Sequence, residues 1–195
     1  MKRRVSALLL ALTLAVSLAS GAFAATYSNW FKSTYDEIHQ LEKVKNRTIL
    51  PKEFESMDLK QNITRAEMCL LAVQAFEAAT DNDIELDGTQ YFTDTNDVNI
   101  IKAYEYGIVS GYPDGTFRPD QLITRQEFFK LAENFCAAAA YRPASALVDT
   151  KIDQFRDASA ISNWARDAAQ FCVSNSYVNG TKDESGSIML APTAN

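Results

Sequence analysis

Two stretches of this chain carry apolar residues at helical spacing, and each follows the same short polar signature. The signature is Thr-Arg-x-Glu, which begins at Thr64 and again at Thr124. In such a capping box the threonine hydroxyl accepts from the backbone N–H of the glutamate, and the carboxylate accepts from the N–H of the threonine. The apolar positions that follow predict two amphipathic helices. They are Met68, Leu71, Ala72, Ala75 and Phe76, then Phe128, Phe129, Leu131, Ala132 and Phe135.

A glycine-containing stretch precedes the second box. Gly107 and Gly111 bracket a short apolar segment. This predicts a helix that stops at Gly107, where glycine accepts a positive φ, and a very short extended segment after it. Pro113-Asp114-Gly115 then predicts a tight turn, because proline fixes φ, aspartate binds its own backbone and glycine takes the left-handed position.

These features repeat along the chain. The Ile-Thr-Arg-x-Glu boxes recur after 60 residues, Phe92-Thr-Asp94 recurs as Phe155-Arg-Asp157 after 63, and Gly111 recurs as Gly180 after 69. Repetition at such intervals predicts tandem structural units. We place three units at residues 25–80, 90–142 and 149–195.

The three units differ in quality. The second is the best preserved. The first is degenerate: a helix is expected to end near Asn46, but Thr48-Ile-Leu-Pro51 replaces the glycine segment and the turn. The third reaches Pro192 and stops where its Thr-x-x-Glu helix would begin. We interpret this as truncation, with natural erosion of a last repeat as the alternative.

Two linkers separate the units, at residues 80–89 and 141–149. The first contains Asp83-Ile-Glu-Leu-Asp87-Gly88, which partly matches a calcium-binding loop, but position 12 would be Asp94 instead of the usual glutamate. We therefore predict a solvated acidic linker and no metal site, and keep calcium-dependent docking as an alternative.

The second unit resembles the S-layer homology family, whose modules hold exported bacterial proteins on the cell wall. The matching pieces are Phe92-Thr-Asp94, Gly107-Ile-Val-Ser-Gly111, Asp114-Gly-Thr-Phe-Arg-Pro119 and Ile123-Thr-Arg-Gln-Glu127, in this order. The resemblance implies a mainly α fold of three tandem helix–loop–helix motifs with pseudo-threefold symmetry and very short strands in the loops. It also implies grooves between motifs that bind secondary cell wall polysaccharide, often pyruvylated.

The resemblance also implies the residues of the site. The arginine of the box would meet the ketal carboxylate, while a tryptophan and loop glycines would shape the sugar contact. Thr95 stands where the second unit would have this tryptophan. By position, the implied ligand-binding residues are Arg65, Arg125, Trp164, Gly111, Gly180, Asp94 and Asp157.

Residue chemistry supports part of this assignment. Arg65 and Arg125 fall in the first turns of their helices, where free backbone N–H groups and the dipole favour an anion. A guanidinium can hold a carboxylate through two hydrogen bonds. The alternative is a structural ion pair, such as Arg125 with Asp120. If Arg125 serves the ligand, Arg125→Ala should weaken binding and leave stability nearly unchanged. For Asp94 and Asp157 the residues favour helix N-capping.

The N-terminus predicts export. Lys2-Arg3-Arg4, an apolar run over 5–19 and Ala22-Phe23-Ala24 form a signal peptide over residues 1–24, too short in its apolar part to span a membrane. Its removal takes away three basic and no acidic residues, so the formal charge of −6 becomes −9. This acidity argues against nucleic acid as a partner.

No catalytic set is visible. The chain has one histidine, no Gly-x-Ser-x-Gly elbow and three cysteines, Cys69, Cys136 and Cys172, all in apolar helical contexts. We predict that these are buried thiols, with one disulfide plus a free thiol as the alternative. We therefore expect a non-enzyme without cofactors.

The sequence thus predicts a secreted cell-surface protein anchored non-covalently to secondary cell wall polysaccharide on peptidoglycan, with S-layer or surface-protein assembly as its setting. The alternative function is a degenerate helical scaffold for protein–protein assembly that binds no sugar.

Overall fold

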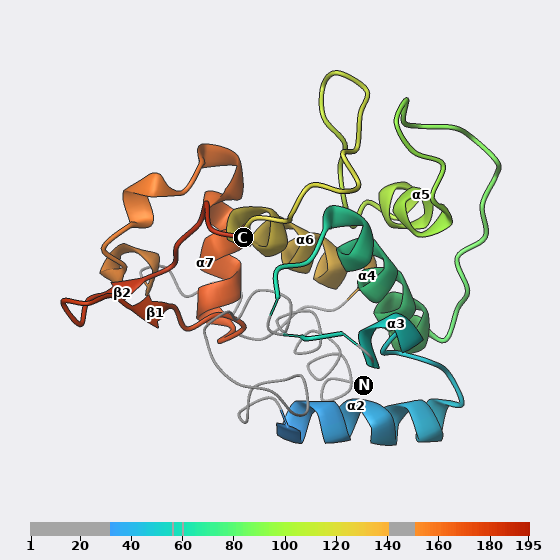
Figure 1. Cartoon of the computed structure of the whole chain (residues 1–195), viewed down its shortest axis with the longest axis horizontal. Coiled ribbons are helices and arrows are strands. Elements are labelled where there is room, and N and C mark those ends of the chain that lie inside the picture. The colour runs from blue at the N-terminus through green and yellow to red at the C-terminus, as the bar shows by residue number, and fades with distance from the viewer. Residues whose placement is uncertain (1–31, 56, 60, 141–150) are drawn as a thin grey trace.

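The computed structural model describes residues 32–55, 57–59, 61–140 and 151–195 (Figure 1). The predicted signal peptide at 1–24 and the second linker at 141–149 lie outside these residues. The helices and strands, in chain order, are α2 (Lys32–Lys45), α3 (Lys52–Glu55), α4 (Arg65–Thr80), α5 (Val98–Glu105), α6 (Arg125–Ala138), η3 (Lys151–Gln154), η4 (Ala158–Ala160), η5 (Asn163–Ala165), α7 (Arg166–Ser174), β1 (Thr181–Lys182) and β2 (Ile188–Met189).

The protein is mainly α-helical, as predicted. In the described part of the chain the strands form one antiparallel pair, in which Thr181 faces Met189 and Lys182 faces Ile188. Helix α5 packs against α4, and α7 packs against α6. Figure 1 shows α6 lying between α4 and α7, so the helix that follows the second capping box is central to the molecule.

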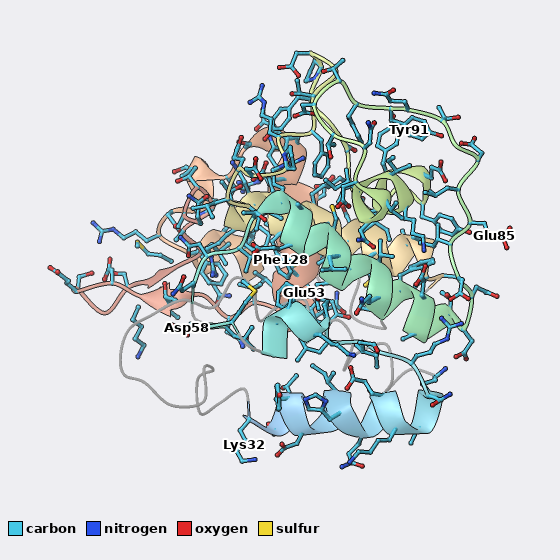
Figure 2. All side chains as sticks on the ribbon, turned by 45° about the vertical axis from the view of Figure 1, so that its right-hand side comes forward. Lys32, Glu53, Asp58, Glu85, Tyr91 and Phe128 are labelled. Carbon is cyan, nitrogen blue, oxygen red and sulfur yellow. The ribbon has the colours of Figure 1, made fainter. Side chains whose placement is uncertain are left out.

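The apolar faces of α4 and α6, the two helices that follow the capping boxes, form the core. Phe128, Phe129 and Phe135 are completely buried. Phe76 of α4 meets Phe135 of α6 edge to face, with ring centroids 6.0 Å apart. Figure 2 shows Phe128 in the middle of the molecule, whereas Lys32 and Glu85 lie at its periphery. The helical stripes read from the sequence are therefore the faces that pack together.

Both capping boxes are confirmed. Thr64 accepts from the backbone N–H of Glu67 and Thr124 from that of Glu127, and each glutamate accepts from the N–H of its threonine. The stop at Gly107 is also confirmed, since its φ is +67°. The predicted turn forms too: Gly115 has φ of +81°, and its N–H donates to the Tyr112 carbonyl at 3.0 Å.

The start of α5 corrects one expectation. The helix begins at Val98 because Asp97 accepts from the N–H groups of Asn99 and Ile100. Asp94 lies three residues before this cap and does not cap the helix. In the first unit, α2 ends as predicted, followed by Asn46 with φ of +50°.

The linker at 80–89, which was predicted to be solvated, forms two ion pairs with the first unit. Asp81 forms an ion pair with Lys45, and Asp83 forms one with Arg47 at 2.6 Å. Both basic residues come from the C-terminal end of α2 and its following turn. The first carboxylate of the calcium-loop pattern is therefore directed toward a guanidinium. Among the described residues, no group of three or more His, Cys, Asp or Glu side chains is placed to hold a metal ion.

The three cysteines lie in α4, α6 and α7, and all are buried as free thiols. The buried-thiol prediction is confirmed, and the disulfide alternative is not what the structure shows. In the described part of the chain, no helix is both long and apolar enough to cross a bilayer.

Candidate functional site

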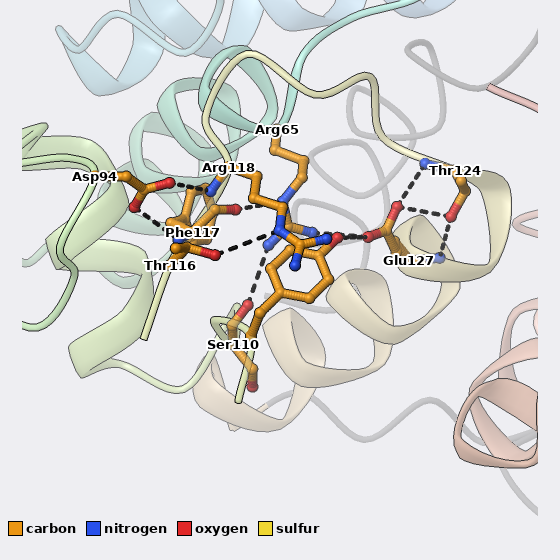
Figure 3. A network of polar contacts seen from close by, with 9 residues as sticks. Arg65, Asp94, Ser110, Thr116, Phe117, Arg118, Thr124 and Glu127 are labelled. Atoms are coloured by element: carbon orange, nitrogen blue, oxygen red, sulfur yellow. Dashed lines mark hydrogen bonds and ion pairs between the residues drawn. The ribbon is translucent and has the colours of Figure 1, made fainter. Parts of the chain in front are cut away.

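Arg65 reaches from the start of α4 into the loop of the next unit. Its Nε donates to the Phe117 carbonyl at 2.9 Å, its Nη1 to Oε1 of Glu127 at 2.9 Å, and its Nη2 to the Ser110 carbonyl at 3.2 Å (Figure 3). All three nitrogens of this guanidinium therefore have protein partners. We call the contact between the start of α4 and loop 110–119 the first junction.

Two aromatic rings cover the Arg65 guanidinium. Its central carbon lies 4.4 Å from the ring centroid of Phe117 and 5.0 Å from that of Tyr112. The Tyr112 hydroxyl donates to Oε1 of Glu127 at 3.0 Å. Burial raises the pKa of the Tyr112 hydroxyl above its ordinary value.

Glu127 links the junction to the helix cap. Its Oε2 accepts from the backbone N–H and the hydroxyl of Thr124, at 2.8 and 2.7 Å, while its Oε1 accepts from Arg65 and Tyr112. A single carboxylate thus closes the capping box of α6 and fixes the arginine of the preceding box. The sequence pattern identified the capping function alone.

The second junction repeats this geometry between α6 and the segment 190–194. Nε of Arg125 donates to the Leu190 carbonyl at 2.6 Å, as Nε of Arg65 does to that of Phe117. Main-chain contacts repeat as well. Arg65 and Ala66 donate from their backbone N–H groups to Gln121 and Pro119, and Arg125 and Gln126 donate to Ala194 and Pro192, at 2.8 to 3.0 Å.

These contacts correct the expectation that the first-turn N–H groups await an anion, because carbonyl groups of the following segment already accept from them. The arginines themselves are 8% (Arg65) and 9% (Arg125) exposed. Burial lowers the pKa of Arg125 from its ordinary value. Because Arg125 is buried, its replacement would alter packing as well as any ligand contact, so from the structure we expect Arg125→Ala to lower stability as well.

Asp94 and Asp157 do not cap helices, contrary to the sequence-based expectation. Asp94 accepts from the backbone N–H groups of Phe117 and Arg118, both at 2.8 Å (Figure 3). Asp157 accepts from those of Leu190 and Ala191, at 2.8 and 2.6 Å. Each carboxylate thus accepts from the backbone N–H groups of the two residues before a proline, an arrangement that we call a clamp. The clamp fixes the segment whose carbonyl, that of Phe117 or Leu190, accepts from the arginine of a capping box.

The degenerate first unit retains this clamp with a different residue. Oε1 of Glu42, on α2, accepts from the N–H groups of Ile49 and Leu50 at 2.7 and 2.8 Å, just before Pro51. The sequence pattern did not identify Glu42, because it occupies a helix instead of the Phe-x-Asp position.

Gly111 and Gly180 are required by close packing. A Cβ at Gly111 would lie 2.4 Å from Cε1 of Phe92, and one at Gly180 would lie 2.6 Å from Cε1 of Phe155. The aromatic residue of each Phe-x-Asp segment thus lies against the glycine of its own unit. Whether these glycines also contact a ligand stays a prediction.

Trp164 lies on η5 and is 52% exposed. Its segment packs against α6, and the backbone N–H of Ser162 donates to Oε1 of Gln126 at 3.1 Å. The second junction thus gathers the start of α6, the Asp157 clamp and the segment that carries Trp164. The first junction gathers Arg65, the Asp94 clamp and the Gly111 loop.

The fold and these junctions define a helical protein whose successive units are joined by equivalent buried arginines. Residues 92–129 match the family described as S-layer homology domain. The chain therefore contains an S-layer homology domain, which covers the Asp94 clamp, the loop of the first junction and the start of α6.

Two relatives from Acetivibrio thermocellus are similar to a larger part of the chain. One, "Cell surface glycoprotein 1", is 30% identical over 132 residues, which is 64% of this chain and 6% of that protein. The other, "Cellulosome-anchoring protein", is 28% identical over 130 residues, 64% of this chain and 28% of that protein. The matched region is thus a small part of either relative. No solved structure matches this chain significantly.

Proposed function

We propose that this chain anchors an exported protein non-covalently to the bacterial cell wall, by binding secondary cell wall polysaccharide at the junctions between its helical units. The S-layer homology domain at 92–129 supports a non-catalytic, surface-anchoring role. The names of the two relatives, a cell surface glycoprotein and a cellulosome-anchoring protein, support the same role. The wider setting would be assembly at the cell surface.

The observation that carries the proposal is the composition of the second junction. It places an arginine, at the start of α6, next to the segment of the half-exposed Trp164. An exposed indole is a suitable surface for stacking on a sugar ring, and a guanidinium suits a carboxylate substituent such as a pyruvate ketal. We further propose that the three units are arranged about a pseudo-threefold axis and that the sugar lies between neighbouring units.

Binding to purified wall sacculi tests the function. The full chain should bind sacculi that carry the secondary polysaccharide and should not bind sacculi from which hydrofluoric acid has removed it. Trp164→Ala should weaken binding without lowering the melting temperature, because the ring is half exposed. Val98→Ala is the matched control, since Val98 is equally exposed (52%) but lies on α5.

Failure to bind untreated sacculi, or equal binding to stripped ones, would overturn the proposal. That result would favour the alternative of a helical scaffold for protein assembly. Each of the three Arg65 guanidinium nitrogens donates to a protein group, and this observation supports the alternative at the first junction.

A further inference from the structure

Asn179 and Gly180 lie in the connection between α7 and strand β1 (Figure 1). They form the only Asn-Gly dipeptide in the sequence. Asn179 is exposed, whereas Val178 before it is buried. In such a dipeptide the backbone nitrogen of the second residue can attack the side-chain amide carbon of the asparagine, because glycine has no side chain to obstruct the approach. The chemistry of this connection therefore depends on whether the fold holds the two reacting groups.

Neither reacting group is held. In the described part of the chain, the side-chain amide of Asn179 and the backbone N–H of Gly180 have no hydrogen-bond partner. The pairing of β1 with β2 begins one residue later, where Thr181 faces Met189. An exposed side chain changes rotamer rapidly, so the Asn179 amide carbon can approach the Gly180 nitrogen without breaking a contact.

A second asparagine, four positions earlier, is held in both respects. Nδ2 of Asn175 donates to the Phe171 carbonyl at 2.8 Å. The next backbone nitrogen, that of Ser176, donates its N–H to the Val173 carbonyl at 3.0 Å. Asn175 therefore serves as an internal comparison, in which the same reaction would have to break two hydrogen bonds.

The corresponding turn of the second unit is protected in the same way. Asp114 is followed by a glycine, but its Oδ1 accepts from the backbone N–H and the hydroxyl of Thr116. The Gly115 N–H donates to the Tyr112 carbonyl at 3.0 Å. The free state of the Asn179-Gly180 pair is thus a feature of its own connection and not of every glycine turn in the chain.

We propose that Asn179 is a site of spontaneous deamidation, through a cyclic imide formed with Gly180. The Gly180 nitrogen forms a bond to Cγ of Asn179 and loses its proton, and the side-chain nitrogen leaves as ammonia. Water then opens the ring at either carbonyl and leaves aspartate or isoaspartate at position 179. Water is the only co-reactant, and the reaction does not depend on the anchoring function.

The isoaspartate product changes the backbone at a crowded place. Its main chain runs through the former side-chain carbon, which adds a methylene group immediately before Gly180. A Cβ on Gly180 would already lie 2.6 Å from Cε1 of Phe155 and 2.7 Å from the Met189 carbonyl, so the segment has little room to shift. In the second unit the residue that corresponds to Asn179 is Ser110, whose carbonyl accepts from Arg65. Isoaspartate should therefore destabilise the third unit at its contact with α6.

Peptide mapping of the full chain tests the site. Trypsin releases residues 167–182 as a single peptide that contains both Asn175 and Asn179. After incubation of the folded protein at mildly alkaline pH, fragment masses should place deamidation at Asn179 and leave Asn175 intact, and an isoaspartyl methyltransferase should label the same peptide. A parallel sample in urea gives the time scale for the unfolded chain. An unmodified Asn179 in the folded sample after the urea sample has reacted, or equal modification of Asn175, would overturn the proposal.

Two variants separate the backbone change from the change of charge. Asn179→Gln should keep its melting temperature during the incubation, because glutamine forms the larger ring far more slowly. Freshly purified Asn179→Asp carries the new charge without the added methylene, so it should melt like the fresh wild type. The incubated wild type, enriched in isoaspartate, should melt at a lower temperature than both variants. An unchanged melting temperature of that sample would overturn the predicted effect on the third unit, whatever the outcome of the sacculus-binding experiment.

Discussion

Nη1 of Arg65 and Oε1 of Glu127 lie 2.9 Å apart, although 62 positions separate the two residues in the sequence. Each belongs to a capping box, so the arginine of one box pairs with the glutamate of the next. The two box helices α4 and α6 are thereby fixed relative to each other at their N-termini. The Phe76–Phe135 contact joins the same two helices within the apolar core.

Glu127→Gln should destabilise the protein by about 2–3 kcal/mol, because Arg65 loses a charged hydrogen bond at a largely buried position. Glutamine still serves at the third position of a capping box, so the cap itself should survive. Glu67→Gln is the matched control, since Glu67 caps α4 in the same way and no arginine among the described residues donates to it. Urea unfolding measures both variants, and equal losses would show that Glu127 acts through its cap alone.

Gly111→Ala should destabilise the protein by about 1–3 kcal/mol through overpacking. The added Cβ would lie 2.4 Å from Cε1 of Phe92 and 3.0 Å from the Thr116 carbonyl. Phe92→Leu in the same chain should restore part of the loss, because it removes the nearest atom. Thermal unfolding of the two single variants and the double variant checks this, and strictly additive losses would argue against the steric explanation.

All three thiols should resist alkylation in the folded protein at neutral and mildly alkaline pH. Burial raises the pKa of Cys69 and of Cys136 to about 12, and that of Cys172 well above its ordinary value. The thiolate, which is the reactive form, is therefore scarce. Titration with a chromogenic disulfide should find the thiols masked in buffer and all three reactive in denaturant. Recovery of a single reactive thiol in denaturant without reductant would instead reveal a disulfide.

Asp114 should titrate far into the acid range. Hydrogen bonds from the Thr116 hydroxyl and then from Arg118 hold its pKa at about 2, below the ordinary 3.8. Because the folded pKa is the lower one, the contribution of Asp114 to stability is fully present above pH 3.8 and is lost as the pH falls toward 2. Asp114→Asn should flatten the stability profile over this range. Carboxyl chemical shifts measured against pH report the midpoint directly, and a midpoint near the ordinary value would contradict this reading of the turn.

The features that the sequence determined are those set by neighbouring residues. The Thr64 and Thr124 boxes, the stop at Gly107 and the turn at Gly115 each depend on backbone hydrogen bonds within a few positions. The apolar stripes also revealed which faces of α4 and α6 are buried, because helical spacing is a local property. Repetition of these signals predicted tandem units, and the resemblance of residues 92–127 to the S-layer homology family supplied the expected fold class.

Tertiary structure alone decided the partners of the charged residues. Asp94 looked like a helix cap, yet its carboxylate accepts from amides more than twenty positions away, because the folded loop presents two unpaired N–H groups there. Glu42 does the same for Ile49 and Leu50 from a different element. Arg65 appeared available to a ligand until packing placed Phe117, Tyr112 and Glu127 around it. A charged side chain can satisfy its hydrogen bonds with any group that folding brings near, so its partner is fixed by the packing of distant segments and not by its own neighbours.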